Sequence, residues 1–415
     1  MNPRFCLSNL SGSGRFFFRL PALFRAAFAS RVVFSFPAAF LARLIFFCCA
    51  AIFFTACTSP GKPAAAPGKI LPFDTLRYAK GFTVQRYDTY TAVEIPDPWD
   101  SARILQRYLL VDRTRPLPKG LPKGTVVKVP ARKVVVYTSV HAAILDQLGE
   151  IGQVAGVCEP RYMDTPAIRE GVASGRIADL GEATSPDIER MIELGAELII
   201  ASPFQNSSYG PAEKIGIPIL EAADYMESLP LGRTEWVRLY GLLFGKEAVA
   251  DSIFRATEQR YLALKALACD VSRRPSVLTE KRFGSTWFLP AGDSYMAHLY
   301  KDAGADYLFA DQPGSGSVPW AFESVFDRAI HADVWFVKYN SASDLTYAGL
   351  QTEYAPYAHF DAFRNRRIYG CNTGSVPYYE EFPIHPDYLL RDLIAILHPE
   401  LLPGDTTRYF FPMPE

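Results

Sequence analysis

The stretch that decides the fold runs from Lys133 to Val157 and reads KVVVYTSVHAAILDQLGEIGQVAGV. Its first apolar run, Val134–Tyr137, predicts a buried strand, and Val154–Val157 predicts a second one. Between them, Val140–Leu148 predicts a helix. An apolar strand, a helix and another apolar strand form the repeating unit of a parallel sheet that is covered on both faces.

This alternation occurs in two blocks along the chain. The first block continues through strands expected at Leu198–Ala201 and Ile217–Leu220. A long amphipathic stretch then begins at Thr234, with one weak point at Phe244–Lys246, and the alternation restarts with a strand at Ser276–Thr279. The sequence therefore predicts an α/β protein of two Rossmann-like lobes joined by a single long α-helix, with a β-rich N-terminal extension.

The expected organisation divides the chain into six parts. They are a signal peptide (1–56), a flexible tether rich in Pro, Ala and Gly (57–69), the β-rich extension (70–130), the N-terminal α/β lobe (131–233), the linker helix (234–272) and the C-terminal α/β lobe with its tail (273–415). In the extension, strands are expected at Phe82–Arg86, Tyr90–Ile95, Arg103–Val111 and Thr125–Val129.

The N-terminal segment has the pattern of an export signal. Its first 56 residues carry arginines and no acidic residue, and the apolar run Leu44–Phe54 (LIFFCCAAIFF) is too short to span a bilayer, which takes about 20 residues. The junction Thr55-Ala56-Cys57 resembles the lipobox of bacterial lipoproteins. That resemblance implies cleavage before Cys57, acylation of this residue and anchorage in a lipid bilayer. An uncleaved anchor helix is the alternative.

Charge and cysteine content exclude some classes of protein. A net charge of −1 removes the main electrostatic reason to expect nucleic acid as a partner. Beyond Cys57 the chain holds only Cys158, Cys269 and Cys371, which are too widely spaced for a disulfide framework or a cysteine-based zinc site.

Several longer phrases resemble a known family. They are ARKVVVYTSVHAAILDQLG (131–149), GRIADLGEATSPDIERMIELGAELIIA (175–201), KIGIPILEAADY (214–225) and GSGSVPWAFESVFDRAIHADVWFV (314–337). Their order and spacing resemble the helical-backbone periplasmic substrate-binding proteins that serve ABC importers of iron–siderophores, haem and vitamin B12. The resemblance implies a periplasmic lipoprotein, monomeric and not an enzyme, that delivers a small-molecule metal complex to an ABC permease and its ATPase.

The ligand is expected in a cleft between the lobes, because open α/β sheets bind ligands beyond the carboxyl ends of their strands. The loops at those ends carry many aromatic and some basic residues, which suit a bulky, often anionic ligand such as a ferric siderophore, haem or corrinoid. No intrinsic cofactor is expected. The predicted cleft residues are Ser139, His141, Arg161, Tyr162, Glu182, Phe204, Asn206, Tyr225, Lys281, Phe283, Trp287, Ser317, Trp320, Tyr339, Asn340, Tyr378 and Tyr379.

Two glutamates are expected to dock the protein on its permease. In relatives that bind B12 or siderophores, a glutamate on the rim of each lobe pairs with permease arginines, and Glu189 and Glu323 match those positions. A carboxylate in the first turn of a helix also has a plain structural role, because it favours the helix dipole.

Two other functions remain open on the sequence. A zinc- or manganese-binding protein of the same fold needs several converging His and carboxylates, and of the six histidines only His141 falls on a first-lobe cleft loop. His141 could instead bind haem iron, hydrogen-bond a ligand or belong to the core. A lipoprotein enzyme is the other possibility, but the chain contains no nucleophile elbow, P-loop or H-E-x-x-H motif.

Overall fold

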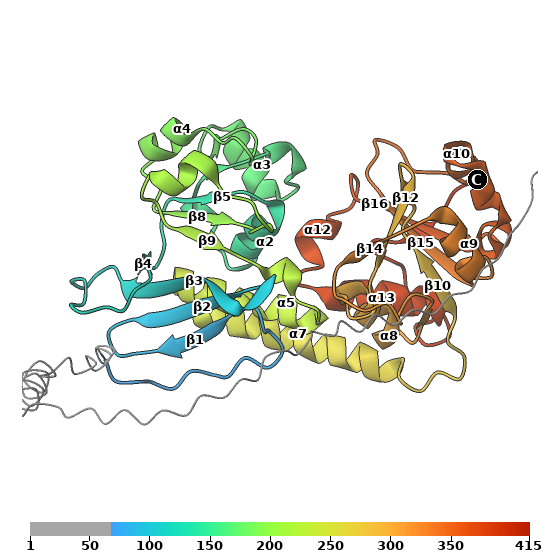
Figure 1. Ribbon diagram of the computed structural model, residues 1–415, viewed down its shortest axis with the longest axis horizontal. Helices are drawn as coiled ribbons and strands as arrows, with labels where there is room; N and C mark the ends of the chain where they lie inside the picture. Colours follow the sequence, from blue (N-terminus) through green and yellow to red (C-terminus); the bar gives the residue numbers. More distant parts are fainter. Residues whose placement is uncertain (1–67) are drawn as a thin grey trace, which may run out of the picture. The chain divides into compact units, whose positions relative to one another are not determined.

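The computed structural model describes residues 68–415 (Figure 1). The predicted signal peptide, Cys57 and nearly all of the tether therefore lie outside the described residues. In the described part, Cys158, Cys269 and Cys371 are unpaired, as the sequence predicts. No helix between residues 68 and 415 combines the length and apolar character needed to cross a membrane.

The first lobe is built on a parallel five-stranded sheet with the order β7-β6-β5-β8-β9. Every residue of the central strands β5 and β8 is buried, because helices cover both faces and only apolar side chains fit there. The strands are β5 (Val134–Val136), β6 (Val154–Val157), β7 (Ala178–Asp179), β8 (Leu198–Ala201) and β9 (Ile219–Glu221), and the helices are α2 (Ser139–Gln147), α3 (Pro166–Ala173) and α4 (Ile188–Glu193).

The second lobe repeats this plan with the order β13-β10-β15-β16-β17, in which only β17 is antiparallel to its neighbour. The same lobe contains a small antiparallel sheet with the order β11-β12-β14. The strands are β10 (Ser276–Thr279), β11 (Arg282–Phe283), β12 (Thr286–Pro290), β13 (Asp306–Tyr307), β14 (Ser317–Trp320), β15 (Val334–Tyr339), β16 (Ile368–Asn372) and β17 (Phe411–Pro412). The helices are α8 (Tyr295–Asp302), α9 (Phe322–Ala329), α10 (Tyr347–Glu353), α11 (Asp361–Arg364), α12 (Tyr378–Glu381) and α13 (Pro386–Leu397).

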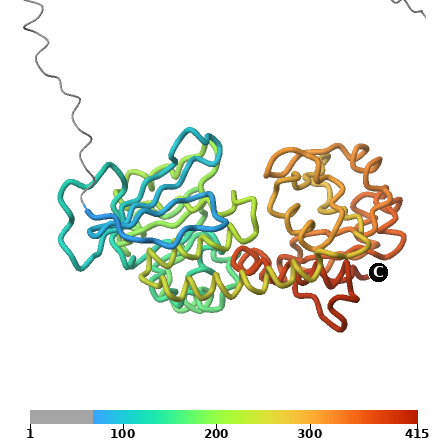
Figure 2. Tube along the Cα trace, turned by 90° about the horizontal axis from the view of Figure 1, so that it is seen from below, coloured from blue at the N-terminus to red at the C-terminus, as the bar shows by residue number. Residues whose placement is uncertain are grey.

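One long helix, α7 (Glu247–Leu267), joins the two lobes, as Figures 1 and 2 show. Its Phe254 is fully buried in the core of the first lobe and its Tyr261 is buried in the core of the second. The helix starts later than the expected position 234, because Gly245 adopts a left-handed conformation (φ 67°) and ends the preceding helix. The residues before this break form α5 (Pro230–Glu235) and α6 (Val237–Phe244).

The β-rich extension folds onto the first lobe. Its four strands are β1 (Thr83–Arg86), β2 (Thr91–Asp97), β3 (Asp100–Asp112) and β4 (Thr125–Val129), in sequential order. The ring of Phe82 packs 4.9 Å from the ring of Trp236, which is itself fully buried. The hydroxyl of Tyr108 donates to the carbonyl of Ile219 at 2.7 Å and accepts from the amide of Glu221 at 2.9 Å. The extension therefore shares a core with the first lobe and is fixed to its edge strand β9.

A second contact between the lobes lies at α12 (Figure 1). The buried carboxylate of Glu380, in the second lobe, accepts from the backbone amides of Asp164 at 2.7 Å and Thr165 at 3.3 Å, at the start of α3 in the first lobe. Burial raises the pKa of this carboxyl group. Ile384, just beyond α12, is buried in the core of the first lobe. The lobes are therefore connected through α12 as well as through α7.

Buried carboxylates hold the segment from Arg77 to Gly81, which leads into the extension. Glu235, fully buried on α5, accepts from the backbone amides of Arg77, Tyr78 and Ala79 and also pairs with Arg238 at 3.2 Å. Glu227 accepts from the amides of Lys80 and Gly81, and Glu258 on α7 accepts from the Arg77 guanidinium and the Tyr78 hydroxyl. This seam of carboxylates provides hydrogen-bond partners for the backbone of a partly buried segment that has no secondary structure of its own.

We predict that Glu235→Ala destabilises the protein by about 3–5 kcal/mol, because it removes the acceptor of three partly buried amides and one of the two carboxylates that pair with the buried Arg238 guanidinium. Urea unfolding of the full chain measures this change. The matched control is Glu193→Ala, whose side chain is 65% exposed and pairs only with Arg190 of its own helix; its effect should stay within about 0.5 kcal/mol. Equal effects of the two substitutions would contradict the anchoring role.

Candidate ligand-binding site

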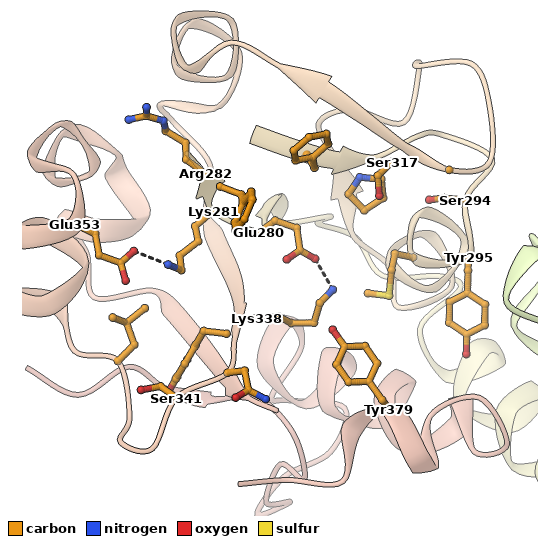
Figure 3. Close-up of a pocket in the computed structure, with 18 of the residues that line it drawn as sticks. Glu280, Lys281, Arg282, Ser294, Tyr295, Ser317, Lys338, Ser341, Glu353 and Tyr379 are labelled. Carbon is orange, nitrogen blue, oxygen red and sulfur yellow. Dashed lines mark hydrogen bonds and ion pairs between the residues drawn. The ribbon is translucent and has the colours of Figure 1, made fainter. Parts of the chain in front are cut away.

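A cavity of about 1190 Å³ lies beyond the carboxyl ends of β10 and β15 and is called the main cavity below. Most of its lining comes from the second lobe, and the first lobe contributes Tyr225 and Met226 (Figure 3). Of the residues predicted from the sequence, the structure brings together Tyr225, Lys281, Phe283, Ser317, Tyr339, Asn340 and Tyr379 at this cavity. Its position agrees with the rule that α/β sheets bind ligands at their strand ends.

Two ion pairs lie in the cavity wall. The ammonium group of Lys338 contacts the carboxylate of Glu280, and Lys281 lies 2.5 Å from Glu353 (Figure 3). Burial alone would lower the pKa of Lys338, but the negative charge of Glu280 and the neighbouring tyrosines raise it well above its ordinary value. Lys338 is therefore a fixed positive charge at the floor of the cavity, and an acidic partner neutralises it while no ligand is bound.

Glu280 has an unusual backbone conformation. Its φ is +62°, in the left-handed region, which costs a non-glycine residue free energy and is concentrated at functional sites. The surrounding hydrogen bonds hold this conformation, since the Glu280 amide donates to Phe336 and its carbonyl accepts from the indole of Trp335 at 2.6 Å. The turn directs the carboxylate toward Lys338.

Exposed aromatic side chains surround these charges. Phe283 is 82% exposed, Tyr379 is 51% exposed and Phe288 is 44% exposed, and all three line the cavity. Large apolar side chains are seldom left exposed as a group without a binding role. The cavity can therefore offer flat apolar surfaces together with fixed cations.

Several lining residues were not found by sequence reasoning. They are Met226, Glu280, Arg282, Phe288, Ser294, Tyr295, Met296, Ser341, Asp344 and Glu353, among others. Glu280, Arg282 and Ser341 adjoin predicted loop residues, so the strand-end rule would have found them if whole loops had been considered. Tyr295 and Met296 open α8, and nothing in their sequence distinguishes them from core residues.

Five predicted residues of the first lobe lie on exposed loops outside this cavity. They are Arg161, Tyr162, Glu182, Phe204 and Asn206. Arg161 forms a bidentate pair with Glu182, at 2.7 and 2.9 Å, and its guanidinium lies 4.6 Å from the centre of the Tyr162 ring. These residues follow β6, β7 and β8, at the carboxyl edge of the first sheet. Ser139 and Trp320 are half-buried and also lie outside the cavity lining.

Three predicted cleft residues lie in the cores instead, which corrects the expectation that they face a ligand. Trp287 is fully buried, and its indole donates to the carbonyl of Thr279 at 3.0 Å. The reason is strand alternation, because neighbouring residues of β12 point to opposite faces and Phe288 takes the exposed side. Tyr378 is buried with its ring 4.6 Å from that of Phe382, whereas the adjacent Tyr379 is exposed.

His141 is the third of these buried residues. Its Nδ1 lies 2.7 Å from the hydroxyl of Tyr240 and its Nε2 lies 3.2 Å from the Ser202 hydroxyl. Burial lowers the pKa of its imidazole from 6.5 to about 4. His141 is therefore a neutral core residue with a polar partner on each ring nitrogen, and not a group exposed to ligand.

Metal-ligating side chains do not gather anywhere in residues 68–415. No group of three or more His, Cys, Asp or Glu residues in that range is arranged to hold an ion. Four histidines each lie near a single carboxylate, as His331 lies 2.7 Å from Asp361; the other three are His298, His385 and His398. A zinc or manganese site needs several converging ligands, so the described residues offer no support for the free-metal alternative.

Two lobes of parallel sheet, joined by one helix and flanking a charged aromatic cavity, define a solute-binding protein. Comparison with known proteins agrees, because the periplasmic binding protein family matches residues 134–373. The chain belongs to this family. This confirms the expected family and fold, and membership of a family of binding proteins confirms that the chain is not an enzyme.

The similarity extends to individual proteins. An uncharacterized lipoprotein of Methanocaldococcus jannaschii is 28% identical over 363 residues, which cover 81% of this chain and 84% of the relative. The petrobactin-binding protein of Bacillus subtilis is 34% identical over 111 residues, covering 25% of this chain and 33% of that protein. A solved structure of a possible iron-binding, periplasmic solute-binding protein from Staphylococcus epidermidis has a TM-score of 0.52 at 17% identity, and covers 65% of this chain and 99% of that one.

We predict that His141 makes stability depend on pH between 6.5 and 4. The unfolded chain takes up a proton at this residue below pH 6.5, and the folded chain does so only near pH 4, so folding stability is lost as the pH falls through this window. The unfolding free energy of the wild type relative to His141→Gln should therefore fall by about 3 kcal/mol between pH 7 and pH 4. Urea titrations at several pH values measure it. The control, His359→Gln at an exposed position, should show a smaller change, and an equal change would contradict the assignment.

Proposed function

We propose that this protein is the solute-capturing lipoprotein of an ABC importer and binds a ferric siderophore, or a comparable iron or corrinoid complex, in the main cavity. The observation that carries the proposal is the cavity of about 1190 Å³ beside the first lobe, with exposed aromatic side chains and fixed cations in its wall. Flat apolar walls stack against planar chelating groups, and the cations complement their negative charge.

The ligand is proposed to bring its metal already coordinated. Residues 68–415 provide no cluster of metal-ligating side chains, so the donor atoms would come from the chelator. The similarity to a petrobactin-binding protein over part of the chain supports a siderophore ahead of haem or a corrinoid. Release of Lys338 from Glu280 and of Lys281 from Glu353 would give an anionic chelate two cations without moving the backbone.

The proposal also places the protein outside the cytoplasm, held by a lipid on Cys57. The basic segment, the apolar run and the Thr55-Ala56-Cys57 junction support this location, and two relatives in Methanocaldococcus jannaschii are described as lipoproteins. From there the protein would pass its ligand to a permease and its ATPase.

We predict that Lys338→Ala weakens binding of an anionic ferric tricatecholate probe about tenfold, the effect of losing about 1.4 kcal/mol. Glu280→Gln should strengthen binding, because it leaves Lys338 without its competing partner. Quenching of intrinsic fluorescence on titration with the probe measures both. The control is Lys265→Ala on the linker helix, whose half-exposed ammonium pairs with Asp302 of α8; neither residue lines the cavity. If neither cavity variant changed binding, the proposed site would be refuted. A visible absorption spectrum of the protein purified from its native host would show whether it carries a coloured ligand.

Permease docking is proposed for Glu189 and Glu323. Both side chains are exposed, in the first turns of α4 and α9. Each of these helices leads into the amino end of a strand, β8 or β15, so both glutamates lie at the carboxyl edge of their sheets, where the main cavity also lies. An exposed carboxylate on each lobe could register the protein on two permease subunits.

We predict that Glu189→Ala and Glu323→Ala retain ligand affinity but reduce transport, and that the double change to Arg reduces transport further through repulsion of permease cations. Uptake of a radiolabelled ferric probe by cells, compared with binding to the purified variants, separates the two effects. Glu193→Ala, exposed on the same helix as Glu189, is the control. Lost ligand affinity in the single variants would assign these residues to ligand binding and not to docking.

A further inference from the structure

The turn between β2 and β3 lies next to the main cavity. The hairpin closes through Pro98 and Trp99, with Asp97 paired opposite Asp100. A second cavity, of about 240 Å³, is lined by Pro96 and Pro98 from this hairpin, by Met226 and Leu229 from the first lobe and by Asp293 and Ser315 from the second. Three separate parts of the chain therefore meet there.

The two cavities adjoin each other. Met226 and Ser315 line both of them, so a ligand that fills the main cavity and extends past these two residues reaches the hairpin. The hairpin surface at this point consists of two proline rings, which suit aliphatic parts of a ligand better than charged ones.

The hairpin is held in this position from both of its ends. Irregularities in the β2–β3 pairing at Pro96 bend the ribbon, and the Asp97 carboxylate accepts from the Trp99 amide at 2.9 Å and so fixes the turn. Tyr108 fixes β3 to the edge strand of the first lobe. The segment before β1 is fixed by Glu227, which belongs to the same loop as Met226. Such an anchored turn keeps its position when a ligand arrives.

The hairpin also lies outside the part of the chain that the family accounts for. The family match begins at residue 134, whereas β2 and β3 span residues 91–112. The two lobes alone would leave the second, adjoining cavity without the two prolines that the hairpin supplies.

We propose that the β2–β3 hairpin is a third wall of the ligand site, which contacts an aliphatic arm of the bound chelate and limits the size of ligand that the protein accepts. This inference rests on the proposed function, because it assumes that the main cavity holds the chelate. It assigns Pro96 and Pro98 as specificity-determining residues in the extension.

The test uses the full chain with ferric desferrioxamine B, a ferric tricatecholate, haemin and cyanocobalamin as probes. For the probe that the wild type binds best, Pro98→Arg should weaken binding at least about tenfold, because a long cationic side chain enters the passage beside Met226. The control is Leu117→Arg, at a 59% exposed position in the loop between β3 and β4. Thermal unfolding of both variants verifies that they fold.

A second measurement tests contact directly. The background replaces Cys269, the exposed cysteine among residues 68–415, and also Cys6, Cys48, Cys49 and Cys57 with Ser. In it, Pro98→Cys should react with a maleimide several-fold more slowly when the probe is bound, whereas Leu117→Cys should be unaffected. Unchanged affinity in Pro98→Arg, or weakened affinity without protection of the cysteine, would overturn the third wall. A wild-type chain that binds none of the four probes would instead overturn the proposed function, and this inference with it.

Discussion

The arrangement of this protein depends on one helix that is buried in two cores at once. Phe254 and Tyr261 are seven residues apart on α7, so they lie on the same face, two turns from each other. One ring packs in the first lobe and the other in the second. Because a helix kinks sharply only where its hydrogen-bond ladder is interrupted, α7 limits how far the lobes can move apart, and the Glu380 contact adds a second constraint.

The two lobes share a plan but contribute unequally to the cavity. Both present strand ends, yet the first lobe supplies only Tyr225 and Met226 to the lining. The second lobe supplies more because its small sheet β11-β12-β14 and helix α12 have no counterparts in the first, and they carry Phe283, Phe288 and Tyr379 into the cavity. The shared plan of the two lobes therefore predicts that a cavity lies at the strand ends, but it does not predict which lobe supplies most of the lining.

The sequence predicted the strands in which every side chain is apolar, because such strands have to be buried on both faces. Val134–Val136 and Leu198–Ala201 are apolar at every position, and such runs fit only a strand covered on both faces. β17 was missed, because the Phe-Pro pair that adds to the sheet edge has no strand pattern of its own and depends on a partner distant in the chain. At the candidate site, the sequence predicted the loops but not which of their side chains face the cavity. Trp287 and Phe288, like Tyr378 and Tyr379, are equivalent as sequence, and only the register of β12 or the packing of α12 decides which one is exposed.

The seam of buried carboxylates that holds Arg77 to Gly81 has a mechanical consequence. A pull on the chain upstream of residue 69 first meets the pairing of residues 69–71 with Arg86 at the end of β1 and with Asp88. Further along the chain, Glu235 and Glu258 join the segment to α5 and α7. Such a pull therefore has to break two successive sets of hydrogen bonds, first those to the extension and then those to the helices.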